Sequence, residues 1–294
     1  MFFTRLSNGW EIAKQSWQVL KRDKALSWFP FFGGIAAILV FASFALPIIA
    51  IPGLRSALDA VVEGGAWSDR LNDRTTQVVV AILGFAFYLL NYFVIVYFNT
   101  AFAACAVDRF RGGDPNVRFG LKMANQRLPQ IVGWSLLAAT VGIILHLIEE
   151  KSEWLGRLVA GILGVVWTAA TFLVLPTLAV EGLGPVEALK RSGSLVRQVW
   201  GEGLAGNFGI GLIGLLLMLP ALLLVVLAFV ADLPPVVSAV VVAATIVYAL
   251  GVSVITTALK QIFIAGLYVY ATEKKIPQGF QGNLMRNAFV PKRS

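Results

Sequence analysis

Six long apolar runs dominate the chain and restrict it to one class of fold. A transmembrane helix needs about 20 predominantly apolar residues. The runs lie at residues 27–51, 76–107, 131–148, 156–180, 204–231 and 236–271. The third is the shortest, whereas the second and sixth exceed the required length and should tilt or continue beyond the bilayer as helix. Since only 14% of the residues are charged, a water-soluble globule is excluded. We therefore predict an all-α, polytopic membrane protein with a single domain of six transmembrane helices.

The basic residues between these runs predict how the chain is oriented. Segments 1–26, 108–130, 181–203 and 272–294 carry 18 of the 24 Lys and Arg residues, and six crossings would place all four on one side. Cytoplasmic loops of membrane proteins are enriched in Lys and Arg. The pattern therefore predicts that both termini are cytoplasmic, with residues 273–294 as a tail. The longest loop on the other side, 52–75, is expected to be irregular or to hold a short helix at 54–62.

Three of the basic segments also have the pattern of amphipathic helices. The segment at 184–204 begins with Gly184-Pro185, which suits a helix start, and its apolar residues recur at helical spacing. The segment at 114–130 follows the same plan, with Asp114 as the expected cap and Pro115 opening the helix. The third segment precedes the first run, with Asn8 as its expected cap and one face formed by Trp10, Ala13, Trp17, Leu20 and Lys24.

These three helices are expected to lie in the membrane interface and to contact lipid. Basic amphipathic helices rest at the level of the headgroups, and their cations face anionic lipids. The predicted headgroup contacts are Lys122, Arg127, Lys190, Arg191 and Arg197. The expected partners are thus membrane lipids with anionic headgroups. A second copy of the chain and another membrane protein remain open as further partners. Nucleic acid is not expected, because no aromatic-rich basic module accompanies the net charge of +8.

The spacing of the amphipathic segments predicts an internal repeat. A shift of 68 positions aligns Leu121 with Leu189, and the neighbouring Lys122 with Lys190. Each segment precedes an odd-numbered apolar run, so the repeated unit would be an interfacial helix, an outward span and a returning span. Three copies with the same orientation imply parallel repeats about an axis normal to the membrane. Chance similarity among basic amphipathic helices is the alternative.

Several short motifs resemble a known family. They are Gly9-Trp10, Ser16-Trp17, Leu20-Lys21, Asp23, Phe29-Pro30, the segment 188–192 and the segment 267–280. Together they resemble a prokaryotic family of six-span membrane proteins of unknown function. More loosely, the helix with the ALKRS motif is similar to the membrane domain attached to some glycerophosphodiester phosphodiesterases. The first resemblance implies an integral protein of the cell membrane and supplies no catalytic residues. The phosphodiesterase domain and its acidic metal site have no counterpart in the sequence.

Polar side chains inside the spans are few, and they are the candidates for a binding site. Such groups are costly in a bilayer and often functional. In the second run, Tyr88, Asn91, Tyr92 and Asn99 form a stripe that should face protein or a cavity. Hydrogen bonds between helices are one interpretation and a ligand cavity is the other. In the sixth run, Lys260 and Gln261 lie roughly 36 Å from the outer end. There Lys260 either extends to the interface or contacts a substrate or lipid phosphate.

Prolines and glycines inside the runs have structural and functional interpretations. Pro47, Pro176 and Pro220 each follow a leucine, and each predicts either fixed curvature or, alternatively, a hinge or a carbonyl binding site. The glycines between 206 and 214 favour close contact between helices.

No motif indicates a reaction. Cys105 and His146 are the only cysteine and histidine, so neither a disulfide nor a histidine- and cysteine-based metal site is expected. The absence of catalytic motifs and of carboxylates within the spans favours a non-enzymatic protein that binds lipid or a partner, without a cofactor or metal. The alternative is a channel or transporter for a small solute or lipid built around the polar stripes, and a lipid-processing enzyme is a third class.

Overall fold

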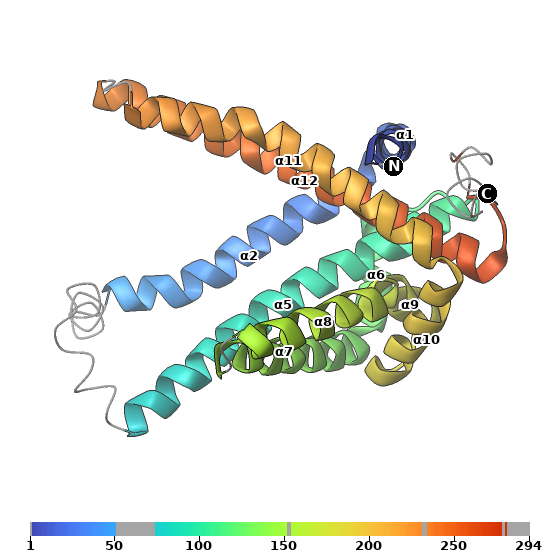
Figure 1. Ribbon diagram of the computed structural model, residues 1–294, viewed down its shortest axis with the longest axis horizontal. Coiled ribbons are helices and arrows are strands. Elements are labelled where there is room, and N and C mark those ends of the chain that lie inside the picture. The colour runs from blue at the N-terminus through green and yellow to red at the C-terminus, as the bar shows by residue number, and fades with distance from the viewer. Residues whose placement is uncertain (1, 51–73, 152–153, 231–233, 278–279, 281–294) are drawn as a thin grey trace.

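The computed structural model describes residues 2–50, 74–151, 154–230, 234–277 and 280, and every regular element in this part of the chain is a helix (Figure 1). Six segments are long and apolar enough to cross a membrane: Ala25–Pro47, Ile82–Phe110, Leu128–Glu149, Leu158–Glu181, Gly209–Val226 and Val236–Glu273. The predicted all-α fold with six spans is confirmed, and the chain is a multi-pass membrane protein. The loop at 52–73, with its expected short helix, and residues 281–294 of the tail lie outside the described residues.

The helices follow one another in three similar units, each an amphipathic helix followed by a pair of spans. The amphipathic helices are α1 (Phe2–Arg22), α6 (Val117–Gln126) and α10 (Pro185–Gln198). Hairpin 1 consists of α2 (Ala25–Ala50) and α5 (Arg74–Phe110). Hairpin 2 consists of α7 (Leu128–Lys151), α8 (Trp154–Thr171) and α9 (Val174–Glu181). Hairpin 3 consists of α11 (Trp200–Val230) and α12 (Pro235–Glu273). The three predicted amphipathic helices are therefore present.

Packing closes the three units into a ring. Helix α6 packs on α5 and α2 of hairpin 1, and α10 packs on α7, α8 and α9 of hairpin 2. Helix α1, the first in the chain, packs on α11 and α12 of hairpin 3. Hairpin 1 is thus covered by α6, hairpin 2 by α10 and hairpin 3 by α1. Because the same packing recurs three times, the threefold plan is a property of the structure as well as of the sequence pattern.

The returning spans meet at the centre of this ring and end in the same way. Helices α5, α9 and α12 contact one another. Shortly after each one, a residue adopts the left-handed conformation: Gly112 at φ 92°, Gly182 at φ 65° and Lys274 at φ 55°. A left-handed residue commonly ends a helix because it redirects the chain away from the helix axis. A proline follows three positions after each of them, at 115, 185 and 277, and a proline cannot donate a backbone hydrogen bond to prolong the helix.

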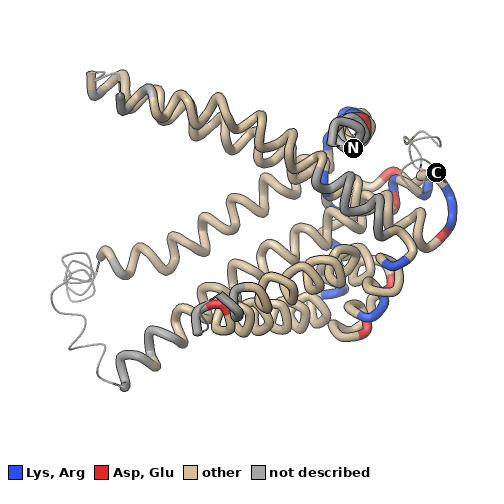
Figure 2. Tube along the Cα trace, viewed as in Figure 1, with Lys and Arg blue, Asp and Glu red and all other residues tan. Residues whose placement is uncertain are grey.

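Most of the charged residues gather at one end of the molecule (Figure 2). We call this the charged end; it comprises α1, α6, α10 and the last turns of α5, α9 and α12. The main apolar cluster lies here. It includes several residues between 96 and 110 of α5 and most residues between 258 and 271 of α12. Away from it, hairpin 3 diverges from the other helices (Figure 1), and side chains such as Ile38, Leu39 and Phe41 of α2 are exposed. Burial is therefore concentrated at the charged end, whereas the opposite halves of the spans present apolar surface outward, as expected of helices solvated by lipid.

Two predicted helix starts were wrong. Asn116, rather than Asp114, caps α6, and its Oδ1 accepts a hydrogen bond from the Phe119 N–H at 2.9 Å. Asp114 instead forms an ion pair with Arg109, which a local capping rule does not consider. Helix α1 begins at Phe2, so Asn8 lies inside it. By contrast, Pro185 occupies the first turn of α10 as predicted.

The three prolines have different effects. Helices α2 and α11 continue through Pro47 and Pro220. The fourth span is interrupted between α8 and α9, and Pro176 lies in the first turn of α9. A proline is tolerated in the first turn because the N–H that it lacks would have no partner inside the helix. The Leu173 N–H at the interruption donates to Oγ of Ser192 on α10, at 3.0 Å. The interruption is thus held by a neighbouring helix.

The glycines of α11 allow close contact with α12, as predicted. A methyl group on Gly214 would lie 2.6 Å from Cγ2 of Thr256, and one on Gly211 would lie 3.6 Å from Nζ of Lys260. Small residues let two membrane helices approach closely, and their dispersion contacts then hold the pair together.

Candidate functional site

The charged end holds the polar contacts that join the three hairpins. At hairpin 1, Nε of Arg109 donates to Oδ2 of Asp23 at 2.9 Å, and Nη2 of Arg109 lies 2.9 Å from Oδ1 of Asp114. The Asp23 side chain is only 5% exposed, whereas that of Asp114 is 93% exposed. Arg109 also donates to the Gly113 carbonyl. Asp23 lies between α1 and α2, so this network fixes the start of the outward span against the end of the returning one.

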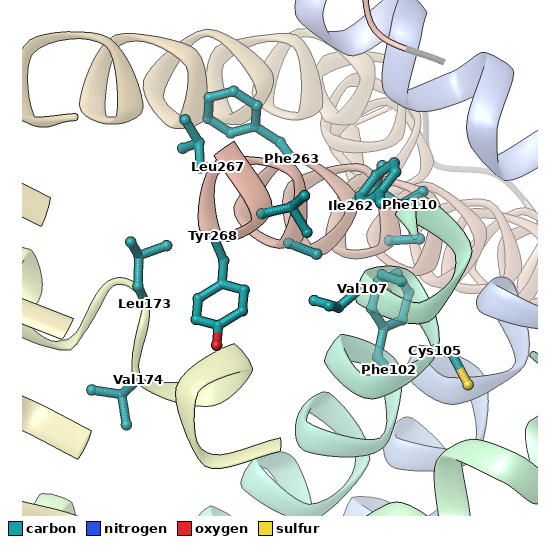
Figure 3. Packing of buried hydrophobic residues seen from close by; sticks show 14 of the residues in the cluster. Phe102, Cys105, Val107, Phe110, Leu173, Val174, Ile262, Phe263, Leu267 and Tyr268 are labelled. Carbon is teal, nitrogen blue, oxygen red and sulfur yellow. The ribbon is translucent and has the colours of Figure 1, made fainter. Parts of the chain in front are cut away.

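A second network joins hairpins 2 and 3. The Tyr268 hydroxyl on α12 donates to Oε1 of Glu181 on α9 at 2.9 Å. Nε of Arg191 on α10 lies 3.1 Å from both carboxylate oxygens of Glu181. Tyr268 is fully buried and points at α9 from within the apolar cluster (Figure 3). A buried hydroxyl needs a partner, and here its partner is a carboxylate that is already neutralised by an arginine.

Two further contacts hold the end of α12. Nε of Arg111, after α5, lies 2.8 Å from Oε1 of Glu273 at the end of α12. Nζ of Lys274 donates to Oε1 of Gln198 at the end of α10 at 2.7 Å. In the second unit, Nε2 of Gln130 donates to the carbonyl of Gly182. Gln130 and Gln198 are 68 positions apart, the shift that aligns α6 with α10. Gln130 thus contacts Gly182, and Gln198 contacts Lys274. In both units the glutamine contacts the left-handed residue that follows the returning span.

The five predicted headgroup residues fall into two groups. Lys122, Lys190 and Arg197 are exposed, and none of them forms an ion pair with a residue that the structure describes. Arg191 is paired with Glu181, and the guanidinium of Arg127 lies against Gly182. The second group thus contacts other protein groups, and the first three are the more exposed cations.

A shallow hollow of about 750 Å³ lies on the outer face of α6. Its lining is formed by Val117, Arg118, Leu121, Lys122, Asn125 and Gln126. This set combines two cations and two amides with two apolar side chains and contains no carboxylate. Such a surface is chemically suited to a phosphate group attached to an apolar body.

The polar stripe predicted on the second span lies along α5. Tyr88 and Tyr92 are neighbours, with ring centroids 6.1 Å apart, and the Tyr88 hydroxyl lies against Gly142 of α7. The Asn91 side chain donates to the Phe87 carbonyl of its own helix at 3.0 Å. Asn99 is half-buried. The contacts of Tyr88 and Asn91 are therefore with neighbouring helix surface and with their own backbone.

Lys260 and Gln261 lie on α12 near the edge of the apolar cluster. Lys260 is half-buried, and its Nζ lies beside Gly211 of α11. Gln261 is buried, and its Oε1 has no hydrogen-bond partner among the described residues. The structure thus places these neighbours on different sides of α12, one against hairpin 3 itself and one in the interior.

The described residues contain no group of three or more His, Cys, Asp or Glu that could hold a metal ion. Cys105 is buried, and its Sγ donates to the Asn116 carbonyl at 3.4 Å. Its environment is that of a packed side chain between α5 and the start of α6.

A family model matches residues 77–279, which is more than half of the chain. Its description is Family of unknown function (DUF6159). The chain belongs to this family. No curated protein and no solved structure matches the chain. Membership of DUF6159 confirms the predicted resemblance to a membrane protein family of unknown function, and the matched segment runs from the start of α5 to the end of α12.

Several residues that organise this DUF6159 structure were not predicted as site residues. Asp23, Ser192 and Tyr268 each bridge two elements through a buried side chain. The Tyr97 hydroxyl also donates to Oδ1 of Asn125, which ties α6 to α5. The first three belong to the short motifs that carry the resemblance, which is the signal that could have identified them. Which residue each of them contacts depends on the fold and not on local spacing.

Proposed function

We propose that this DUF6159 member is a non-enzymatic protein of the prokaryotic cytoplasmic membrane that binds anionic phospholipids through its charged end. The charged end and both termini would face the cytoplasm. This orientation is supported by the 18 Lys and Arg residues in the segments between spans on that side. The anionic surface of the cytoplasmic leaflet attracts such residues by about 1 kcal/mol each.

One observation carries the proposal. Lys122 and Lys190 occupy equivalent positions on α6 and α10, and both are exposed, whereas Arg127 lies against Gly182 and Arg191 is paired with Glu181. Arg197 adds a third outward cation at the end of α10. Two docked helices thus present positive charge at the same place in two units, with no ion pair to these lysines among the described residues. This arrangement suits binding of several lipid headgroups around the bundle.

The first test measures which lipids the protein retains. Native mass spectrometry of the purified protein with equal amounts of phosphatidylglycerol and phosphatidylcholine should show preferential retention of phosphatidylglycerol. The variant Lys122→Gln/Lys190→Gln/Arg197→Gln should lose most of this preference, whereas Lys275→Gln should lose little, because that exposed residue lies after α12 and not on a docked helix. Equal retention of both lipids by the unsubstituted protein would reject lipid-headgroup binding.

The second test measures orientation. In a Cys105→Ser parent, a cysteine at 234 should react with a membrane-impermeant maleimide in intact cells, and a cysteine at 275 should react only after the cells are opened. Both positions are exposed and lie beyond opposite ends of α12. Labelling of position 275 in intact cells would reverse the proposed orientation.

Other classes of function predict different results. A conductance or uptake signal in proteoliposomes that Asn91→Leu and Asn99→Leu abolish would indicate a channel or transporter. Turnover of a defined lipid by the purified protein would indicate an enzyme.

A further inference from the structure

Helix α1 carries an exposed stripe of alternating tryptophan and lysine. The stripe consists of Trp10, Lys14, Trp17 and Lys21, with spacings of four, three and four residues. At 100° per residue, these positions fall within roughly 60° of arc. Trp10 is 60% exposed and Trp17 is 37% exposed. A single exposed apolar residue needs no explanation, but two large indoles aligned with two lysines form a continuous surface.

The opposite side of α1 is the side that holds it in the protein. Ile12, Ala13, Ser16, Val19 and Leu20 are buried, and α1 packs on α11 and α12. The sequence grouped Ala13 and Leu20 with the two tryptophans on one face. The structure divides that face, because Ala13 and Leu20 turn into hairpin 3 and the indoles turn outward. The exposed indoles therefore do not contribute to the packing of α1 on hairpin 3.

The position of α1 places this stripe near the membrane surface. Figure 1 shows α1 almost end-on while the spans extend across the view, so α1 runs across their direction. Its orientation is fixed at its C-terminal end, where Asp23 is paired with Arg109. Within two turns of the start of α2, Trp28 and Phe32 are exposed and stacked at 5.5 Å. A helix that crosses the spans beside the start of one of them lies along the bilayer surface.

The chemistry of the stripe matches the headgroup layer. Indole rings are enriched at the boundary between hydrocarbon and water, and lysines above them reach lipid phosphates. Nζ of Lys21 lies 5.4 Å from the Trp17 ring centroid, which is within the range of a cation–π contact. The stripe contains no carboxylate, so its charge complements an anionic leaflet.

We propose that the Trp10–Lys14–Trp17–Lys21 stripe inserts into the headgroup layer of the leaflet at the charged end and binds anionic phospholipid there. The indoles lie below the phosphates and the lysines contact them. This inference rests on the proposed function, since it assigns part of the anionic-lipid contact to α1, which contributed none of the cations considered above.

A depth scan tests the insertion. Nitroxides would be attached one at a time to cysteines at 10, 14, 17, 18, 21 and 22 in the Cys105→Ser parent, in liposomes of phosphatidylglycerol and phosphatidylethanolamine. Collision with oxygen, relative to collision with a water-soluble nickel complex, should follow the helical period, with high values at 10, 17 and 21 and lower values at 18 and 22. Arg22 is exposed but lies about 120° from Trp10 around the helix, so its label should be the shallowest. Greater access of the nickel complex to 10 and 17 than to 22 would overturn the inference.

A charge test separates this inference from the proposed function. Lys14→Gln/Lys21→Gln should reduce retention of phosphatidylglycerol relative to phosphatidylcholine about fivefold for each lysine that contacts the leaflet, and Lys14→Arg/Lys21→Arg should retain it. If Lys190→Gln/Arg197→Gln lowers the preference and the α1 glutamine variant does not, the inference is wrong and the proposed function stands. If the unsubstituted protein retains phosphatidylglycerol and phosphatidylcholine equally, the proposed function is rejected. If the labels at 10 and 17 are shallow, insertion of the stripe is rejected whatever the lipid preference. Capture of a soluble protein by the stripe, with both labels in water, would also reject it.

Discussion

At the scale of single residues, burial rather than distance separates the structural contacts from the incidental ones. Arg109 lies 2.9 Å from a carboxylate oxygen of both Asp23 and Asp114. Asp23 is almost completely withdrawn from solvent, whereas Asp114 is nearly fully exposed. A carboxylate in water is already well solvated, so its ion pair contributes little. A buried carboxylate has lost that solvation and depends on its partner.

Asp23→Asn should therefore destabilise the protein and Asp114→Asn should not. Because Arg109 is about one-third exposed and keeps its other contacts, we expect a loss of about 1–3 kcal/mol for Asp23→Asn. Thermal unfolding in detergent can be followed by reaction of Cys105, the only cysteine and a buried one, with a fluorogenic maleimide. The midpoint should fall for Asp23→Asn and stay unchanged for Asp114→Asn. Equal midpoints for the two variants would show that burial of Asp23 is not what makes its ion pair important.

At the scale of elements, the sequence predicted what depends on local pattern and missed what depends on distant partners. Six apolar runs and three amphipathic segments follow from length and period alone, and each of the nine forms helix, although the fourth run is interrupted between α8 and α9. Asp114 was assigned as a cap because capping rules consider only neighbours, yet its carboxylate turns to Arg109. The Asp23–Arg109 pair joins residues 86 positions apart, so no local rule could find it. Lys122 and Lys190 are exposed, whereas the position of the Arg127 guanidinium against Gly182 depends on the folded chain.

The docking of α6 depends on a glycine, which gives a prediction for this element. A methyl group on Gly120 would lie 2.6 Å from Cζ of Phe29 and 2.7 Å from the carbonyl oxygen of Ala101. The backbone oxygen cannot move aside easily, so Gly120→Ala should cost about 1–3 kcal/mol. Gly193, within α10, has open space around it. Gly193→Ala should be neutral or stabilise the protein by up to about 1 kcal/mol, because alanine favours the helix.

Circular dichroism at 222 nm during heating would measure both glycine variants. Gly120→Ala should also raise the rate at which native Cys105 reacts with a maleimide, because Sγ lies 2.7 Å from the position of the added methyl group. A stabilising effect of Gly120→Ala would show that α6 does not pack as closely on hairpin 1 as the structure indicates.

At the scale of the whole molecule, three hairpins are joined at one end, and hairpin 3 diverges from the other two toward the opposite end (Figure 1). Helices α5 and α12 have 37 and 39 residues, which corresponds to roughly 56 and 58 Å of helix. A hydrocarbon layer is about 30 Å thick, so each helix is long enough to cross it and continue into the charged end. The apolar cluster and the ion pairs lie in that continuation. Contacts at the charged end thus determine the angles between hairpins whose other halves face lipid.

Tyr268→Phe should loosen one of these joints. It removes the hydroxyl that connects α12 to Glu181 of α9, and the loss of a buried hydrogen bond to a charged group costs about 1.5–3 kcal/mol. Because hairpin 3 diverges from the other two away from the charged end, a small change of angle there becomes a larger displacement along the spans. Nitroxides on Val165 of α8 and Val240 of α12, both exposed, should give a broader distance distribution in Tyr268→Phe by double electron–electron resonance.

Tyr248→Phe provides the matched control for this joint. The Tyr248 hydroxyl donates to the Leu217 carbonyl, so its hydrogen bond stays within hairpin 3. Removal of that hydroxyl should leave the Val165–Val240 distribution unchanged, because no contact between hairpins is lost. A label pair within hairpin 3, on Leu223 and Val240, should be insensitive to Tyr268→Phe for the same reason. Tyr268→Phe could instead broaden the distance distribution of the pair within hairpin 3 as much as that of the pair between hairpins. The Tyr268–Glu181 contact would then stabilise hairpin 3 itself. The angle between hairpins would in that case be set by other contacts at the charged end.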